Sequence, residues 1–547
     1  MPTAALKPLL AAAAALLAAA AATAEAPVLD VGARKQLFID YRFIEAAEGV
    51  RLNLNPPYRT GEVLVSTDAP WETKLIVASY SSVAKENGRV RLWYQVSGNQ
   101  REPGKNPEFM GVAYAESTDG IHFEKPILNL VELDGSRRNN LVMPDDPKRL
   151  AQGGGSVGRD DNPRCPADER YKSWQKIYPK PGSGIRGPHR VWVSPDGLRW
   201  KLSPKPVTGL RAADTQPTWF WDPRVARYVG YSREWVRFHE GPVRMASYNE
   251  SDDMHAWEKM QIALGPDEAD FTAFPRPAVE LDRVKLDRER LVVEAPGRPV
   301  EEALRPGEDP VPFPGAPLDV YGPGVFPYLE ADNVYVALVS MFHHYLRDGK
   351  LTWPDTGDVR LAVGRDGIHF QQPGGRSPFL RPGPAGSFDS KWLWPLPRPI
   401  RMGDELWIYY VGMNVDHSSR VEAGAGGLRT AVSRAVMRLD GFVSADFDYS
   451  GGSLISPPLR FTGLRLRLNL DTGGGGGGRV ELLDAAGVPI PGYTLGAADP
   501  LNGNSVRMAV TWGGKADVSA LAGKPIRLHL RMRSAKLYAF QFGESGS

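Results

Sequence analysis

The chain has little of what marks several large classes of protein. Cys165 is the only cysteine among its 547 residues, so no disulfide can form within the chain and burial of apolar side chains must hold the fold. After residue 24 no apolar run approaches the about 20 residues that a membrane-spanning helix needs. The 66 basic and 64 acidic residues nearly cancel, a balance that indicates neither nucleic acid nor an anionic membrane as a partner.

Motifs for metal binding are missing as well. The sequence has no His-Glu-x-x-His and no Cys-x-x-Cys, so a zinc site is unsupported. Its Asp-containing turns lack the alternating ligands and the closing Glu of a calcium loop. Residues 165–170 match a sulfatase nucleophile site only in part, because Pro and Arg fall at the wrong spacings. We therefore expect neither a metal nor an organic cofactor.

The first 24 residues have the pattern of a signal peptide. Lys7 precedes an apolar run over 9–22, and the segment 22–24 (Ala-Thr-Ala) fits a small-x-small cleavage site. We expect residues 1–24 to be removed on export, which predicts a secreted or periplasmic protein without a membrane attachment. The oligomeric state has no signal in the sequence.

A short motif recurs five times along the chain. Each copy combines a strand-like aromatic run with a later turn that carries Asp, usually with Gly, and then an aromatic residue. In such a turn Asp and Ser accept backbone N–H bonds, and Gly supplies a positive φ. The turns span residues 117–123, 194–200, 251–257, 364–370 and 438–442, and their aromatic runs are 91–94, 170–174, 227–231, 334–338 and 406–410.

Repetition of a four-stranded unit is typical of propeller blades. Apolar residues elsewhere alternate or form short runs bounded by Gly, Pro, Asp and Asn, so the predicted fold class is all-β. We predict a five-bladed β-propeller over 27–445, closed by a strand at 36–44. The insertions 127–159 and 265–317 are expected to be loops. The blades are expected near 60–126, 160–205, 214–262, 318–372 and 388–445.

The last hundred residues change character. Strict alternation of apolar and polar residues predicts strands that show one face to a core, as in a C-terminal β-sandwich over 446–547. The Gly-rich segment 473–478 is expected to be a hairpin connection, since no Lys-Ser/Thr follows it as in a phosphate loop. The module either shields the propeller or binds sugar. Its strands are expected at 465–470, 479–483, 507–512 and 526–532.

Acidic residues precede the expected first strand of nearly every blade. Converging carboxylates repel one another, which splits their pKa values and lets one act as an acid beside an ionised base or nucleophile. Two such groups flank the scissile oxygen in glycoside cleavage. Alternatively, each Asp only caps backbone amides in a turn. The candidates are Glu62 or Asp68, Asp160 and Asp161, Asp214, Asp319 and Asp389.

Other side chains at matching places suit a sugar substrate. Arg233, His343 and His417 each follow the second strand of a blade and could hold hydroxyls or an anionic substituent. Trp394 could form a sugar platform or pack between blades. We therefore predict Asp389, Arg233, His343, His417 and Trp394 as substrate-binding residues.

The five units, with Asp160 and Asp161, Asp214 and Asp319 at their openings, resemble the five-bladed glycoside hydrolases. These include invertase-like, arabinanase-like and mannoside-phosphorylase-like families, and the likeness spans about residues 35–445, with a sandwich appended. The resemblance implies three funnel acids: a nucleophile or base, a transition-state stabiliser and a general acid. The Asn-Asp-Pro-Asn and Arg-Asp-Pro motifs of the invertase-like enzymes are absent in recognisable form.

These observations together predict an exported, exo-acting glycoside hydrolase with Asp161, Asp214 and Asp319 as catalytic carboxylates. Its partner is expected to be an oligo- or polysaccharide. Two alternatives stay open: a phosphorylase of the same clan, and a propeller that binds carbohydrate without cleaving it. A sialidase is disfavoured, because its propeller has six blades and needs three clustered Arg residues.

Overall fold

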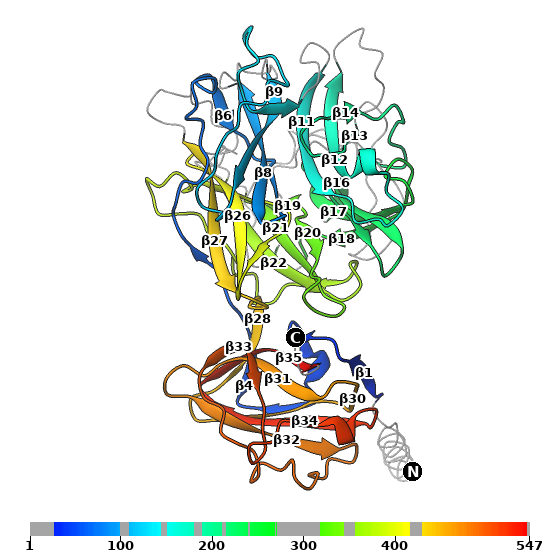
Figure 1. Cartoon of the computed structure of the whole chain (residues 1–547), viewed down its shortest axis with the longest axis vertical. Coiled ribbons are helices and arrows are strands. Elements are labelled where there is room, and N and C mark those ends of the chain that lie inside the picture. Colours follow the sequence, from blue (N-terminus) through cyan, green and yellow to red (C-terminus); the bar gives the residue numbers. More distant parts are fainter. Residues whose placement is uncertain are drawn as a thin grey trace, which may run out of the picture. The chain divides into compact units, whose positions relative to one another are not determined.

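The computed structural model shows an all-β chain whose regular elements are strands and short 3₁₀ helices (Figure 1). It describes residues 27–98, 109–143, 150–179, 189–210, 215–238, 241–267, 270, 318–343, 356–415 and 429–543. Over this part of the chain, no helix has the length and apolar character needed to cross a membrane. The predicted signal peptide at 1–24 lies outside the described residues.

The chain divides into two compact units. One is Leu54–Phe442, and the other joins the residues up to Asn53 with Val443–Ser547. The expected boundary put residues 27–53 with the propeller, whereas the structure assigns them to the unit that holds the C-terminal strands. That unit is therefore discontinuous in sequence.

The discontinuous unit contains two sheets of six strands that share one hydrophobic core. Leu468 and Phe540 come from one sheet and Leu482 and Leu530 from the other, and all four are at most 1% exposed. The strict alternation noted in the sequence explains this, because every second side chain points to the same face. One sheet contains β1 (Leu29–Gly32), β3 (Ala46–Glu48), β29 (Gly452–Ile455), β30 (Leu459–Phe461), β32 (Gly477–Asp484) and β34 (Ile526–Arg533). The other contains β2 (Gln36–Leu37), β4 (Val50–Leu54), β28 (Val443–Phe447), β31 (Arg465–Asp471), β33 (Asn504–Ala509) and β35 (Ala535–Gly543).

Residues 36–44 do not close a ring of blades, so that expectation is wrong. Gln36 and Leu37 pair with Phe540 and Ala539 of β35. The chain then makes a single 3₁₀ turn at Tyr41–Phe43, capped by Asp40. Phe38 and Phe43 of this segment are buried in the core of the discontinuous unit. The aromatic pattern thus marked a buried segment correctly but could not say which core it enters.

The unit Leu54–Phe442 contains the five repeats. The first three form separate sheets, and the fourth and fifth are joined through one parallel pair, Gly357 with Trp392. The first sheet is β6 (Leu75–Val77), β7 (Ser82–Glu86), β8 (Arg89–Gly98), β9 (Met110–Ser117) and β10 (Leu141–Met143). The second is β11 (Leu150–Arg159), β12 (Tyr171–Pro179), β13 (His189–Ser194) and β14 (Lys201–Leu202); the third is β15 (Thr218–Asp222), β16 (Arg227–Phe238), β17 (Gly241–Ser251) and β18 (Trp257–Leu264).

The fourth repeat consists of β19 (Leu318–Gly322), β20 (Val325–Pro327), β21 (Tyr335–His343), β22 (Thr356–Gly364) and β23 (Phe370–Gln371). The fifth consists of β24 (Trp392–Pro395), β25 (Ile400–Met402), β26 (Glu405–Met413) and β27 (Thr430–Arg438). These strands fall close to the repeat boundaries that the sequence predicts. The insertion 127–159 is the exception. It supplies β10 to the first sheet and β11 to the second, so the expectation that it is only a loop is wrong.

The repeated turns have the predicted hydrogen bonds. The Oγ of Ser117 accepts the N–H of Gly120 at 2.9 Å, and Oδ1 of Asp119 accepts the next two N–H groups at 2.8 Å each. The turn after Ser194 repeats all three bonds. A positive φ recurs at Gly120, Gly197, Met254, Gly367 and Asp440. These side-chain bonds satisfy backbone donors that a tight turn leaves without strand partners.

One aromatic side chain of each repeat contacts the repeated turn of the next repeat. The aromatic side chain of the fifth repeat contacts the turn of the first. Trp93 of the first repeat donates to Gly197 O of the second at 2.7 Å, and Trp174 of the second stacks on Trp257 of the third at 4.8 Å between ring centroids. Tyr231 of the third repeat donates to Gly367 O at 2.6 Å, Tyr328 of the fourth to Asp440 Oδ1 at 2.6 Å, and Tyr409 of the fifth to Gly120 O of the first at 2.8 Å. The contacts therefore form a closed cycle of repeats.

The fifth repeat is completed by a strand from near the start of the unit. β5 (Tyr58–Arg59) pairs with β27, with Arg59 opposite Ala435, and Val65 forms a further bridge to Val432. Pairing of the two ends of the unit leaves β27 covered rather than as an open sheet edge. An N-terminal segment thus performs the expected closing role, but from residues 58–65 instead of 36–44.

Gly230 gives a test of the packing between repeats. A Cβ at Gly230 would lie 2.5 Å from the Trp257 ring and 2.9 Å from the Trp174 ring. Gly230→Ala should therefore destabilise the protein by about 1–3 kcal/mol in denaturant-unfolding experiments. The control is Gly98→Ala, whose Cβ would meet its neighbours at no less than 3.8 Å. Equal stability of the two variants would contradict the tight contact.

Candidate functional site

The antiparallel strands of each repeat run between two ends of the repeat, and these two ends carry different residues. In the fourth repeat, Tyr335 lies opposite Gly364 beside the repeated turn, whereas His343 lies opposite Leu318 and Thr356 at the other end. We call these the turn end and the distal end. The distinction decides which side chains can act on one substrate together.

Asp319 lies near the distal end on β19 and is almost fully buried. Its Oδ1 accepts the backbone N–H of Arg244 at 2.8 Å, and its Oδ2 accepts a guanidinium N–H of the same residue at 2.5 Å. Asp319 is 2% exposed, so water screens this pair little. The pair joins β19 of the fourth repeat to β17 of the third. A carboxylate fixed in this way by two donors suits the charged role of a base or nucleophile.

Aromatic rings surround the guanidinium of Arg244. Its Cζ lies 4.4 Å from the ring centroid of Trp235, 5.3 Å from that of Phe342 and 5.5 Å from that of Tyr321. Arg233, predicted as a substrate-binding residue, lies 5.4 Å from the Trp235 ring. Stacking on aromatic faces fixes a planar guanidinium and reinforces its charge interaction with a carboxylate. Arg233, Arg244 and Asp319 therefore belong to one buried region.

His343 lies at the distal end as well, on β21. Its Nε2 is 3.0 Å from Oδ2 of Asp358 on β22, and the two side chains are each 11% exposed. Leu318, which pairs with His343, is the immediate neighbour of Asp319. His343 and its carboxylate partner thus lie next to β19, the strand that carries Asp319. The role of His343 in substrate binding stays a prediction.

Asp389 precedes β24 at the distal end but is held inside the protein. It accepts hydrogen bonds from Tyr410 at 2.9 Å and Ser387 at 2.7 Å, and it forms an ion pair with Arg59. A Cβ at Gly412 would lie 2.5 Å from that of Asp389, so the glycine makes room for it. Burial raises the pKa of Tyr410, and the charge of Asp389 raises it further, which keeps the phenol a donor.

Trp394 is packed between repeats. It is 3% exposed, lies parallel to Trp392 at 5.5 Å between centroids, and meets Tyr321 and Tyr80 edge-on at 4.9 and 5.2 Å. Of the two roles left open for this residue, this geometry matches packing between blades. Its indole lies in the same aromatic group that borders Arg244.

Asp161 does not join Asp319. The expectation that it precedes the first strand of the second repeat is wrong, because β11 ends at Arg159, directly before it. Arg159 pairs with Tyr171 at the turn end of that repeat. Asp161 is therefore at the end of the strands opposite to Asp319. The Gly-rich run 153–155 within β11 explains the error, since it shows none of the alternation expected of a strand.

The neighbouring Asp160 has a structural environment. Its Oδ2 accepts bonds from Lys172 and Tyr228, each at 2.7 Å, and its Oδ1 accepts the N–H of Asn162. Burial works against the charge of Lys172, but Asp160 outweighs it and raises the pKa of the ammonium group. Asp160 is fully buried and capped by these donors. The alternative of a turn-capping Asp fits this residue.

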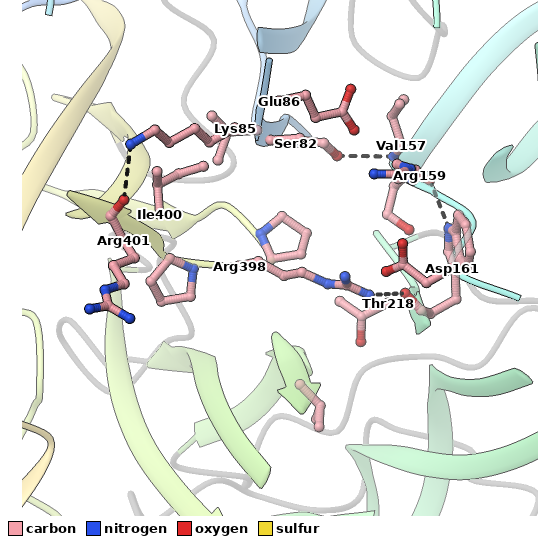
Figure 2. A pocket seen from close by; sticks show the side chains of 18 residues that line it. Ser82, Lys85, Glu86, Val157, Arg159, Asp161, Thr218, Arg398, Ile400 and Arg401 are labelled. Atoms are coloured by element: carbon pink, nitrogen blue, oxygen red, sulfur yellow. Dashed lines mark hydrogen bonds between the residues drawn. The ribbon is translucent and has the colours of Figure 1, made fainter. Parts of the chain in front are cut away.

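A cavity of about 430 Å³ lies where the repeats meet, and residues of all five line it (Figure 2). The lining includes Ser82 of the first repeat, Asp161 beside the second, Thr218 of the third, Val325 of the fourth and Arg398 of the fifth. Arg398 donates to Trp219 O at 3.2 Å. Burial lowers the pKa of Arg398, and the carboxylate of Asp161 acts in the opposite direction. Asp161 thus lines this cavity, and the residue is exposed to solvent.

Two predicted site residues, Asp214 and His417, lie outside the described residues, so their roles stay predictions. Sequence reasoning missed Arg244, Asp358 and Arg398. Arg244 and Asp358 lie inside strands, where nothing local separates them from other charged residues. The local sequence did distinguish Arg398, because it lies between Pro397 and Pro399 in a short connection after an apolar strand. Within the described ranges, no group of three or more His, Cys, Asp or Glu is placed to hold a metal ion.

No protein-family model matches the chain, and no curated protein matches it. Solved structures to which it is similar include a glycosyl hydrolase from Bacteroides ovatus, a β-1,2-mannobiose phosphorylase from Listeria innocua and an N-acetylgalactosamine deacetylase from F. plautii. Their sequence identities are 12%, 12% and 15%, and their TM-scores are 0.42, 0.39 and 0.40. They cover 74%, 71% and 72% of this chain and 97%, 98% and 96% of their own. A likeness of this degree assigns no activity to the chain.

The pair of Arg244 with Asp319 can be tested by a double-mutant cycle. Arg244→Met leaves a buried carboxylate without this cation and should cost roughly 3–5 kcal/mol of unfolding free energy. The double variant Arg244→Met/Asp319→Asn should cost less than the sum of the single variants, by about 1–3 kcal/mol. Lys74→Met, which removes an exposed ion pair with Asp134, should cost under about 1 kcal/mol. Additive effects in the cycle would show that the pair is not coupled.

Proposed function

We propose that Leu54–Phe442 is a five-bladed β-propeller, accompanied by a β-sandwich formed by the discontinuous unit. The cycle of contacts that returns from Tyr409 of the fifth repeat to Gly120 of the first supports this proposal. The pairing of β5 with β27 supports it as well, since it joins the start and end of the same unit. An experimental density map with a different number of sheets around the cavity would overturn it.

We propose further that the protein cleaves glycosidic bonds in an oligo- or polysaccharide, as an exo-acting hydrolase. The observation that carries this proposal is the set of buried charged groups at the distal end: Asp319 with Arg244, His343 with Asp358, and Asp389 with Tyr410. Carboxylates that keep their geometry, cationic groups that bind hydroxyls and nearby aromatic rings are what sugar cleavage needs. The same end receives strand termini from several repeats, so a substrate there can contact more than one blade.

In this proposal Asp319 is the ionised carboxylate, acting as nucleophile or base. Arg244 fixes its orientation, and Arg233 with His343 binds the substrate. Asp214 remains a predicted partner acid from the sequence. Asp389 is assigned a positioning role, in which it holds Arg59 and accepts hydrogen bonds from Tyr410 and Ser387. Asp161 is not given a catalytic role, because it lies at the turn end.

A panel of aryl glycosides and of plant and algal oligosaccharides tests the activity, with and without added phosphate. The wild-type protein should turn over at least one substrate without phosphate. Asp319→Asn should lower kcat by about 100-fold or more while substrate binding persists. Asp252→Asn is the control, because Asp252 pairs with Arg227 at the surface and its side chain is 76% exposed.

The other outcomes separate the alternatives. Release of a sugar phosphate only when phosphate is present would replace hydrolysis by phosphorolysis. Binding of saccharides without any turnover would make the protein a carbohydrate-binding propeller. Full activity of Asp319→Asn would remove Asp319 from the reaction.

We also propose export, supported by the apolar run over 9–22 and the small residues at 22–24. Expression of the full chain in a bacterium with a Sec pathway should give a periplasmic or secreted product. Sequencing of its N-terminus should begin at residue 25 or close to it. A cytoplasmic product that retains residues 1–24 would contradict export.

A further inference from the structure

We propose that the cavity lined by all five repeats is a second ligand site, which binds a sugar-sized molecule carrying one anionic group, a carboxylate or a phosphate. The site lies toward the turn end, away from Asp319. It is independent of the proposed hydrolase reaction and needs none of the distal-end residues.

The size of the cavity fits a ligand of this kind. Its volume of about 430 Å³ lies within the range of about 300–1,000 Å³ typical of small-molecule sites. The five contributing repeats fix its walls, because each is tied to the next by the aromatic contacts described above. A space formed by strands and short connections of a rigid scaffold is largely formed before a ligand arrives.

The charges that line the cavity are unbalanced. Four basic residues, Lys85, Arg159, Arg398 and Arg401, and two acidic ones, Glu86 and Asp161, line the cavity. Two of these six residues, Glu86 and Arg401, have ion-pair partners outside the lining. Of the basic residues, Arg398 is half-buried, whereas Lys85, Arg159 and Arg401 are exposed to solvent. Water therefore screens the charge of Arg398 least.

Glu86 and Arg401 have partners at the edge of the cavity. Glu86 accepts bonds from Tyr171 and, at 3.4 Å, from Arg91. Arg401 donates to Glu330 at 2.5 Å. These pairs neutralise one acidic and one basic residue of the lining. The remaining charged residues of the lining are the basic Lys85, Arg159 and Arg398 and the acidic Asp161.

The three remaining basic groups lack an anionic hydrogen-bond partner among the described residues. Arg398 has five N–H donors, of which a carbonyl, Trp219 O, takes one. The ammonium of Lys85 donates to Arg401 O and to the sulfur of Met402, both neutral. The guanidinium of Arg159 forms neither a hydrogen bond nor an ion pair within the described part of the chain. An anionic ligand group would supply what these donors lack.

Other lining groups fit the neutral part of a sugar. The hydroxyls of Ser156 and Thr218 are buried and have no hydrogen-bond partner among the described residues. In Figure 2 the carboxylate of Asp161 lies beside the guanidinium of Arg398, where it could accept a bond from a ligand hydroxyl. Val83, Val325 and Ile400 add apolar surface for the C–H groups of a sugar ring. This lining is too polar for a hydrophobic ligand, and the cavity is too large for a bare ion.

Titration calorimetry with the full mature chain tests this site. The probes are glucuronate and galacturonate for the carboxylate class, glucose 6-phosphate for the phosphate class, and glucose and inorganic phosphate as comparisons. We expect binding of at least one acidic sugar, with glucose and inorganic phosphate at least tenfold weaker. Which class binds distinguishes the two sources of the anionic group.

Substitution of Arg398 should remove most of that binding. Arg398→Met should weaken the bound acidic sugar by about 10- to 100-fold, because a hydrogen bond to a charged group contributes about 1.5–3 kcal/mol. Arg199→Met is the matched control: it changes the net charge equally, but Arg199 is 71% exposed in the turn of the second repeat. Arg159→Met provides a second lining variant at an exposed position, in case Arg398→Met does not fold.

The site is also separable from the proposed reaction. Asp319→Asn should bind the acidic sugar as the wild type does, whatever its effect on catalysis. Absence of binding for every anionic probe at millimolar concentration would overturn the proposal. So would equal affinity for glucose, equal affinity for inorganic phosphate, or unchanged binding by both Arg398→Met and Arg159→Met.

Discussion

The structure of the repeat unit depends on one kind of interaction: an aromatic side chain of one repeat that reaches the turn of the next. Trp93, Tyr231 and Tyr409 each donate to the carbonyl of a turn glycine with positive φ, and Trp174 makes the equivalent contact by stacking. The turn must expose that carbonyl, so the Ser and Asp that fold the turn also serve the neighbour's aromatic residue. Turn chemistry and packing between sheets are therefore selected together.

This coupling fixes where chemistry can occur. The turn end of each repeat is held to the next repeat by these contacts, whereas at the distal end the third and fourth repeats are joined by the pair of Asp319 with Arg244. Buried charges such as those of Asp319 and Arg244 persist at the distal end only where each has a partner. The inner strands meet around a cavity whose lining combines residues from all repeats. The repeat unit thus carries two charged regions, one at the distal end and one around the cavity.

Local signals in the sequence predicted the repeats well and the inner strands poorly. The turn at Asp119 and the strand over Arg89–Gly98 carry their own hydrogen-bonding and alternation patterns, so neither depends on distant residues. The strand Leu150–Arg159 is Gly-rich and is defined by pairing with β12, which no local pattern records. Asp161 was misplaced for that reason. Of the predicted site, Asp319 and His343 lie at the distal end, but Arg244 and Asp358 could be recognised only once the strands were paired.

The pairing of Arg59 with Ala435 has a consequence for synthesis of the chain. A ribosome makes residue 59 long before residue 435, so the last sheet cannot be completed until most of the polypeptide has emerged. Strands β1 to β4 wait even longer, because β3 pairs with β29 and β2 with β35. Contacts of such large sequence separation are slow to form. Residues 29–54 therefore remain without their native strand partners until the segments that pair with them have been made.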